Sequence, residues 1–326
     1  MLYVSVMPVR NFNRRVHNTL REYFFKKQFP VTKPYKDYAD FLAEYFPGKM
    51  QKLTVDAGFS CPNRDGTVGR GGCTYCNNAS FSPLGHIKRA SVSEQLEAGK
   101  HFFGRKYPDM RYLAYFQSYT STHGDRDKLM SLYSEALGVD MVDGLVIGTR
   151  PDCVDAGLLD LLAHLGKPVF MEYGAESSHN STLEAVNRCH TWEQTVEAVR
   201  MTVEAGLPAG LHFIMGLPGE TTEMMLDTVG RAAALPLSTL KFHQLQIIRG
   251  TRMARDIAAG EDIGVTLFTV DEYISLCGRI VGIIKSHNPS IAIERFTSSA
   301  PSDLLIAPRW GIKNYQFTNL LHRTLL

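Results

Sequence analysis

Short β-rich segments alternate with amphipathic segments from about residue 52 onward. Between the β-rich segments, apolar residues recur at spacings of three and four, which predicts helices that each bury one face. Two of these helices have clear boundary residues: Asp155 and Thr191 stand at N-cap positions, and Gly166 and Gly206 stand where the helices end. The predicted strands span residues 52–58, 112–117, 144–150, 169–175, 209–216 and 240–248.

Strict alternation of six strands with helices predicts an α/β fold built on a parallel sheet. The pattern fits either a six-stranded partial barrel or an open, doubly wound sheet. In a barrel, functional residues lie at the carboxyl ends of the strands. We expect an N-terminal extension at residues 1–36, a core at residues 37–250 and a C-terminal extension at residues 251–326 that packs on the core.

Composition and charge exclude several classes of protein. The 326 residues are 44% hydrophobic and 21% charged, which excludes a disordered, collagen-like or disulfide-stapled chain. The formal net charge of +2 does not by itself require a polyanionic partner. No stretch approaches the roughly 18 apolar residues of a membrane span, and the first residues lack the pattern of a secretory signal. We therefore expect a cytoplasmic protein without a membrane partner.

Residues 1–34 form a basic, aromatic arm in which seven Lys and Arg residues accompany a single acid, Glu22. Five aromatic residues are interleaved with these cations, at positions 12, 23, 24, 25 and 29. One interpretation is a nucleic-acid contact, with cations on phosphates and rings stacked on bases. The alternative is an amphipathic helix that packs on the core.

Three of the six cysteines follow the first predicted strand directly, with the spacing C-x11-C-x2-C: Cys61, Cys73 and Cys76. The loop between them is rich in Gly, Asn and Asp, so its backbone can wrap around an inorganic group. Three thiolates suit an iron–sulfur cluster or zinc, and three ligands leave one metal corner open for a small molecule. The alternatives are structural zinc, with His86 or another histidine as fourth ligand, and plain core cysteines. The remaining cysteines are too scattered in sequence to predict a second cluster.

These residues carry a family resemblance. The three-cysteine loop, Tyr75 within it and HFIMGLPGET at the fifth strand resemble the radical S-adenosylmethionine (SAM) superfamily. The combination of GFSCPNRDG, GRGGCTYC, YFQSYTST, GTRPDC and GLPGE is similar to a bacterial family of radical SAM proteins related to the Elongator catalytic subunit. The resemblance covers residues 37–312. The commonest spacing of the superfamily is C-x3-C-x2-C, and this loop is eight residues longer, as the Elongator-like branch implies.

The resemblance implies a partial (β/α)6 TIM-like barrel with parallel strands and two cofactors. A [4Fe-4S] cluster would be held by Cys61, Cys73 and Cys76, and its fourth iron would chelate the amino and carboxylate groups of SAM. The reduced cluster would break a carbon–sulfur bond of SAM and release a 5′-deoxyadenosyl radical. This chemistry also implies an electron donor such as flavodoxin or ferredoxin.

Other positions at the strand ends are candidates for binding SAM or the substrate. Tyr75 would lie near the adenine, and polar groups after strand two would bind the chelated amino acid. Glu172 would bind the ribose hydroxyls or the ammonium group of SAM, and Arg188 would bind its carboxylate. Glycine at strand five would let the backbone approach the adenine. For each residue an ordinary structural role is the alternative. The SAM candidates are Tyr75, Gln117, Ser118, Thr120, Glu172, Arg188, Gly216 and Pro218, and the substrate candidates are Arg150, Lys241, His243 and Arg295.

Kinship with Elongator, together with the basic arm, makes tRNA the first candidate substrate, through modification of the wobble uridine. A second hypothesis is a radical enzyme that acts on a small molecule or a protein. A third is a zinc-stabilised binding module without catalysis.

Overall fold

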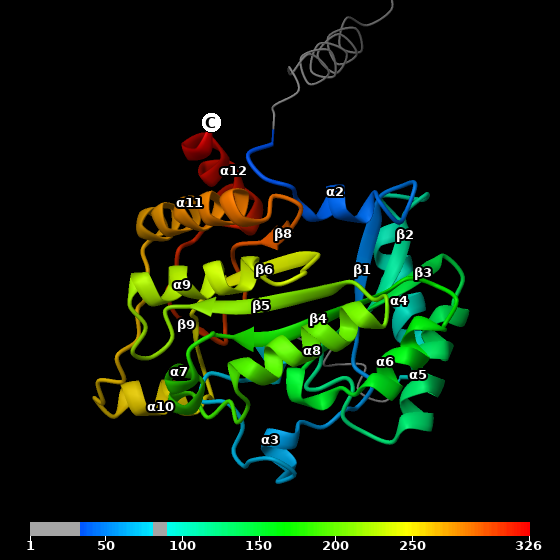
Figure 1. Ribbon diagram of the computed structural model, residues 1–326, viewed down its shortest axis with the longest axis horizontal. Helices are drawn as coiled ribbons and strands as arrows, with labels where there is room; N and C mark the ends of the chain where they lie inside the picture. Colours follow the sequence, from blue (N-terminus) through cyan, green and yellow to red (C-terminus); the bar gives the residue numbers. More distant parts are fainter. Residues whose placement is uncertain (1–32, 81–89) are drawn as a thin grey trace, which may run out of the picture. The chain divides into compact units, whose positions relative to one another are not determined.

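The structure, a computed structural model, describes residues 33–80 and 90–326. In this part of the chain, seven parallel strands form the main sheet in the order β1-β2-β3-β4-β5-β6-β8 (Figure 1). Two short strands, β7 and β9, pair antiparallel in a second sheet. The strands are β1 (Met50–Val55), β2 (Arg111–Phe116), β3 (Val142–Thr149), β4 (Val169–Glu176), β5 (Ala209–Met215), β6 (Thr239–Gln244), β7 (Ile247–Ile248), β8 (Ala292–Arg295) and β9 (Leu305–Ala307).

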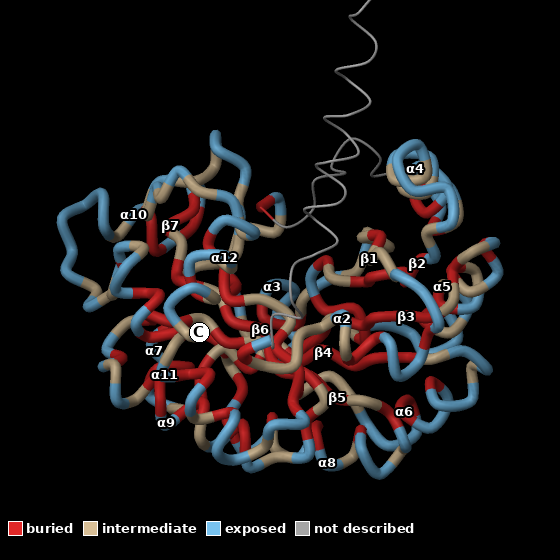
Figure 2. Tube along the Cα trace, turned by 90° about the horizontal axis from the view of Figure 1, so that it is seen from above, coloured by how far each residue is buried: buried red, intermediate tan, exposed pale blue. Residues whose placement is uncertain are grey.

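Helices lie in the connections between strands, before the first strand and after the last. They are α2 (Tyr38–Leu42), α3 (Pro62–Asp65), α4 (Val92–Gly104), α5 (Arg126–Gly138), α6 (Ala156–Ala163), α7 (Asn180–Ala185), α8 (Trp192–Glu204), α9 (Thr222–Ala233), α10 (Arg252–Ala258), α11 (Val270–His287) and α12 (Asn314–Leu325). Two short 3-10 helices, η1 (Asn78–Ser80) and η2 (Pro151–Cys153), follow the cysteine loop and β3. In Figure 2 the buried strands form an arc, and α6, α8 and α9 lie outside it.

The strand order decides between the two expected architectures. Each strand of the main sheet pairs with the next one along the chain, without the reversal of order that defines a doubly wound sheet. The sheet is therefore the curled partial barrel, as predicted. It has one strand more than the six expected, because Ala292–Arg295 adds to the edge of β6. The predicted strand at 240–248 is two strands, since the chain leaves the main sheet after Gln244 and pairs with β9 from Ile247.

The core lies on both faces of the sheet. Three consecutive residues of β3, Leu145, Val146 and Ile147, have no exposed surface, which is expected when helices cover one face and the barrel interior the other. Cys277, on α11, is also completely buried in this core.

The predicted helix boundaries are confirmed. The Asp155 side chain accepts a hydrogen bond from the Leu158 amide at 2.9 Å, and Thr191 forms a capping box with Gln194. The helices end before Gly166 and Gly206, which have φ of +77° and +78°. Local capping chemistry thus places the helices that carry the strand-end loops.

Of the N-terminal extension, only residues 33–36 are described, so the basic arm lies outside the described residues. Among the helices of the described part, none has the length and apolar character needed to cross a membrane. The boundaries expected at residues 36/37 and 250/251 stay predictions.

Candidate functional site

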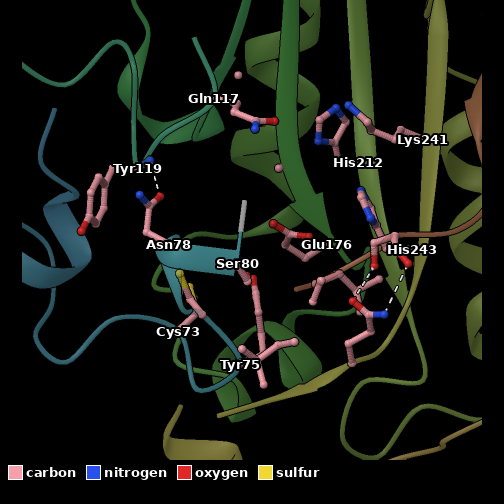
Figure 3. Close-up of a pocket in the computed structure, with 18 of the residues that line it drawn as sticks. Cys73, Tyr75, Asn78, Ser80, Gln117, Tyr119, Glu176, His212, Lys241 and His243 are labelled. Atoms are coloured by element: carbon pink, nitrogen blue, oxygen red, sulfur yellow. Dashed lines mark hydrogen bonds between the residues drawn. The ribbon is translucent and has the colours of Figure 1, made fainter. Parts of the chain in front are cut away.

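A cavity of about 560 Å³ opens at the carboxyl ends of the barrel strands. The cysteine loop forms one end of it, and residues of β2 to β6 and of the 295–301 segment form its walls. Figure 3 shows Cys73 and Tyr75 on one side of this space, His212, Lys241 and His243 on the other, and Glu176 between them. Its volume is that of a typical small-molecule or cofactor site.

All three clustered cysteines line the cavity: Cys61, Cys73 and Cys76. Cys61 is the N-cap of the short helix α3, and the Cys76 amide donates to the Cys73 carbonyl at 3.0 Å. Between them the chain turns at Gly72, whose φ is +75° and where a Cβ would lie 2.9 Å from Nε of Arg64. Arg64 in turn donates to the Cys76 carbonyl at 3.0 Å, which ties the two ends of the loop together.

Hydrogen-bond donors surround the Cys73 sulfur. Asn63 Nδ2 lies 3.7 Å and Arg188 Nη1 lies 3.6 Å from Cys73 Sγ. Burial, with a smaller contribution from Cys73, raises the pKa of Cys76 to about 11, and Arg64 acts against this rise. A thiol in such a place becomes a thiolate when it binds a metal. Donors on ligand sulfurs are also among the features that tune iron–sulfur clusters.

The two candidate inorganic groups place different demands on the thiols. Within residues 33–80 and 90–326, no three His, Cys, Asp or Glu side chains are placed to hold one metal ion. A zinc ion gathers its ligands within about 2.3 Å of one point, whereas a [4Fe-4S] cluster binds each thiolate through a different iron. His86, considered as a zinc ligand above, lies outside the described residues.

Unsatisfied polar atoms lie next to the thiols. Arg188 donates from Nη2 to the Gly174 carbonyl at 2.6 Å and lies 3.7 Å from Glu176, but its buried Nε has no partner in the described structure. The buried Thr120 hydroxyl likewise has none among the described residues. Buried polar groups are normally hydrogen-bonded, so these atoms indicate a polar ligand beside the cluster position. The amino and carboxylate groups of SAM supply that chemistry.

Glu172 occupies a different environment from the expected one. Its carboxylate lies 2.5 Å from Lys52 Nζ, 3.1 Å from Lys241 Nζ and 2.9 Å from His212 Nε2. The two lysines hold the pKa of Glu172 well below its usual range against the effect of burial. Both carboxylate oxygens are thus engaged within the protein, which leaves Glu176 as the better placed acid for a ligand near the thiols.

Glu176 lies in the left-handed region with φ of +68° and lines the cavity. Burial raises the pKa of Glu176, and Arg188 opposes that rise. Such backbone strain in a non-glycine residue is typical of functional sites.

The four substrate candidates all line the same cavity: Arg150, Lys241, His243 and Arg295. Arg150 is almost completely buried and forms a bidentate ion pair with Asp152, at 2.9 and 2.8 Å, while its Nη1 has no partner in the described structure. Lys241 bridges Glu172 and Glu294 and donates to the Tyr115 hydroxyl at 3.1 Å. One cavity therefore has thiol groups at one end and cationic and imidazole groups at the other.

Three SAM candidates do not line the cavity: Ser118, Gly216 and Pro218. Ser118 is buried behind the end of β2. At Gly216, φ is +98° and a Cβ would lie 2.2 Å from the Thr266 carbonyl oxygen, so the missing side chain makes room for the 264–266 segment. The Thr266 amide donates to the Gly216 carbonyl at 3.0 Å across this contact. Tyr75, Gln117, Thr120, Glu172 and Arg188 do line it.

Sequence reasoning missed two cavity residues, Tyr115 and His212, and the ion-pair partner Lys52. Tyr115 and His212 line the cavity, and Lys52 bridges Glu172, which also lines it, and Glu294. Polar side chains inside strongly apolar strands were the available signal, since inward and outward positions alternate along a barrel strand. His212 and His243 occupy such positions on neighbouring strands.

Two family models and one relative match most of this chain. A family model described as the radical SAM superfamily matches residues 65–232, and one described as the Radical_SAM C-terminal domain matches residues 237–326. Protein YhcC of Escherichia coli K12 is 38% identical over 272 residues, which cover 82% of this chain and 85% of YhcC.

Two further matches cover smaller shares of the matched proteins. The tRNA uridine(34) acetyltransferase of Methanocaldococcus jannaschii is 28% identical over 120 residues, which are 36% of this chain and 22% of that protein. The structure of Methanocaldococcus infernus Elp3 with an N-terminal deletion has a TM-score of 0.63 at 14% identity, over 85% of this chain. This chain spans only 63% of that structure, and the likeness shows a shared fold.

Proposed function

Because the chain belongs to the radical SAM superfamily, and is therefore an enzyme whose cofactors are a [4Fe-4S] cluster and SAM, we propose that it modifies RNA, with a wobble uridine of tRNA as its target. The observation that carries the enzymatic part is one cavity lined by all three thiols at one end and by cationic and imidazole groups at the other.

Each end of the cavity has its own task. Cys61, Cys73 and Cys76 would hold the cluster, and the chemistry that a reduced cluster and SAM would supply at this end is one-electron cleavage to a 5′-deoxyadenosyl radical. Arg188 and Thr120 bind the polar groups of SAM with the donors that lack partners within the described protein.

The RNA part of the proposal is supported by sequence. The stretch of 28% identity shared with a tRNA uridine(34) acetyltransferase covers 36% of this chain. The basic, aromatic arm at residues 1–34 supplies cations for phosphates and rings for bases. An acetyl transfer is not proposed, because that match covers only 22% of the acetyltransferase.

Two assays test the proposal in turn. The first reconstitutes the full chain with iron and sulfide under anaerobic conditions, reduces it with dithionite and measures 5′-deoxyadenosine formed from SAM, with Cys76→Ala as control. We expect cluster-dependent product in the unmodified chain alone. A colourless protein that retains zinc instead would contradict the assignment of the thiols.

The second assay adds tRNA purified from cells that lack the protein. We expect faster SAM cleavage and a mass change in the wobble nucleoside, detected by mass spectrometry of digested tRNA. Unchanged turnover and unchanged nucleosides would favour the other hypothesis, a small-molecule or protein substrate.

A further inference from the structure

Two histidine rings stand next to each other on the cavity wall opposite Cys73 (Figure 3). His212 lies on β5 and His243 on β6, with ring centroids 6.0 Å apart and an interplanar angle of 57°. The sequence predicted His243 as a substrate residue but assigned no role to His212. In each ring, one nitrogen contacts a charged side chain, and this contact determines which nitrogen carries the hydrogen.

The partner of His212 fixes its tautomer. His212 Nε2 lies 2.9 Å from a carboxylate oxygen of Glu172, and Glu172 is ionised because Lys52 and Lys241 neutralise it. An ionised carboxylate only accepts hydrogen bonds, so Nε2 of His212 must carry the hydrogen. Burial, assisted by Lys241, lowers the pKa of His212 to about 4, so the ring is neutral near pH 7. Its Nδ1 is therefore a bare acceptor.

The charged neighbour of His243 contacts the other ring nitrogen. Its Nδ1 lies 3.5 Å from Nη2 of Arg295, and a guanidinium only donates hydrogen bonds. Nδ1 of His243 must therefore accept, and burial together with Arg295 keeps the pKa of the ring well below its usual value. In the neutral ring the hydrogen lies on Nε2, which is a donor.

In the part of the chain that the structure describes, His212 Nδ1 and His243 Nε2 have no hydrogen-bond partner. The wall thus offers one acceptor and one donor, on rings whose centroids are 6.0 Å apart and which are each held by a separate charged neighbour. Neither ring carries a charge, so the pair does not favour an anion. It fits a neutral, planar group that has an N–H donor next to an acceptor oxygen.

We propose that His212 and His243 recognise the imide edge of a uracil ring, with His212 Nδ1 accepting from the ring N3–H and His243 Nε2 donating to a neighbouring carbonyl oxygen. The inference rests on the proposed function, and it specifies which atoms of the target uridine the enzyme reads. A site built for a particular donor strongly rejects an analogue that lacks it, because the partner in the protein is left unpaired.

Binding of matched RNAs tests the pair. The probes are an anticodon stem-loop RNA with uridine at the wobble position and the same RNA with 3-methyluridine there, which cannot donate from N3. Affinity for the reconstituted full chain is measured by fluorescence anisotropy. We expect the unmodified protein to bind the uridine RNA about tenfold more tightly or better, the effect of one lost buried hydrogen bond.

Variants separate recognition from structure. His212→Phe and His243→Phe should bring the ratio of the two affinities close to one, whereas His243→Gln, whose amide can still donate, should retain most of the preference. His164→Phe, at an exposed histidine, is the matched control and should leave the ratio unchanged. Cluster absorbance and circular dichroism verify that each variant is folded.

The outcomes for this pair and for the proposed function are distinct. RNA binding with no preference for uridine, or a preference that both phenylalanine variants retain, would overturn the assignment of the histidines and leave the RNA proposal intact. No binding of either RNA would contradict the RNA proposal. Free uridine and 3-methyluridine, titrated in parallel, still test the histidines in that case, since equal binding of the two nucleosides would overturn the pair.

Discussion

At the scale of single residues, the cavity is built from thiol and charged side chains that contact partners far away along the chain. Cys73 accepts hydrogen bonds from Asn63, within the cysteine loop, and from Arg188, which joins the loop to the segment after α7. Glu172 lies among Lys52, Lys241 and His212, which joins four strands of the main sheet. A substitution at such a residue therefore changes the chemical properties of the cavity.

Replacing any one of the three clustered cysteines by alanine should abolish cluster retention and SAM cleavage, because each thiolate would be the only protein ligand of its iron. Iron and sulfide content and 5′-deoxyadenosine formation measure the effect. Cys277→Ala, in the core of α11, is the control and should preserve both. SAM cleavage by Cys61→Ala would show that the first ligand is misassigned.

The pH dependence of stability also originates in single residues. Burial lowers the pKa of His190 to about 2, and neither of its ring nitrogens has a partner in the described structure. Below the unfolded pKa of 6.5, the unfolded chain binds a proton that the folded chain does not, so stability falls as the pH falls. This group alone should remove about 2 kcal/mol between pH 7 and pH 5.

The corresponding measurement is denaturant unfolding at both pH values. His190→Gln should lose about 2 kcal/mol less than the unmodified protein over this interval. His164→Gln, at an exposed position, should match the unmodified protein. Equal losses in all three proteins would show that His190 does not titrate in this way.

At the scale of elements, the turn after β5 couples the barrel to the segment before α11. Gly216 has φ of +98° and contacts Thr266, and the Gly219 amide donates to the Gly264 carbonyl at 2.9 Å. The family motif at this turn thus serves packing in the described structure. Gly216 is required for two reasons, its positive φ and the lack of room for a Cβ.

Two glycine substitutions test this interpretation. Gly216→Ala should destabilise the protein by about 2 kcal/mol or more, since a Cβ would lie 2.2 Å from the Thr266 carbonyl oxygen. Gly230→Ala is the matched control, because a Cβ at Gly230, within α9, would meet no other atom within 4 Å in the described structure. It should stabilise by about 0.5 to 1 kcal/mol. Chemical denaturation measures both, and a neutral Gly216→Ala would refute the packing role.

At the scale of the whole molecule, an RNA substrate has to be bound over a larger surface than the cavity provides. The basic arm is the sequence feature suited to this task, with Arg14, Arg15, Lys26 and Lys27 as its paired cations. Phosphate contacts of this kind release counterions and therefore weaken with salt.

Neutral substitution of those four residues should weaken tRNA binding and reduce the slope of log affinity against log salt by up to about four. Titrations of tRNA at several salt concentrations measure the slope. SAM cleavage without RNA should be unchanged, because Cys61, Cys73 and Cys76 are intact in the substituted protein. Equal RNA affinity and turnover in the substituted protein would eliminate the arm as an RNA contact.

The repeating unit, the helix boundaries and the cysteine loop could all be predicted from the sequence, since each depends on residues that are close along the chain. The alternation of strands and helices predicted the parallel sheet, and capping residues such as Asp155 and Thr191 placed the helices. The spacing of Cys61, Cys73 and Cys76 indicated the metal chemistry for the same reason.

The folding of the sheet determined which side chains far apart in the sequence contact each other. Strand order settled the choice between barrel and open sheet, and it added β8, a strand of four residues that is too short to stand out in sequence. Glu172 pairs with Lys52 and Lys241, which are 120 and 69 residues away along the chain, and this leaves Glu176 facing the ligand position. His212 and His243 both carry the hydrogen on Nε2, but one leaves an acceptor free and the other a donor, because the partner across the sheet contacts Nε2 of His212 and Nδ1 of His243.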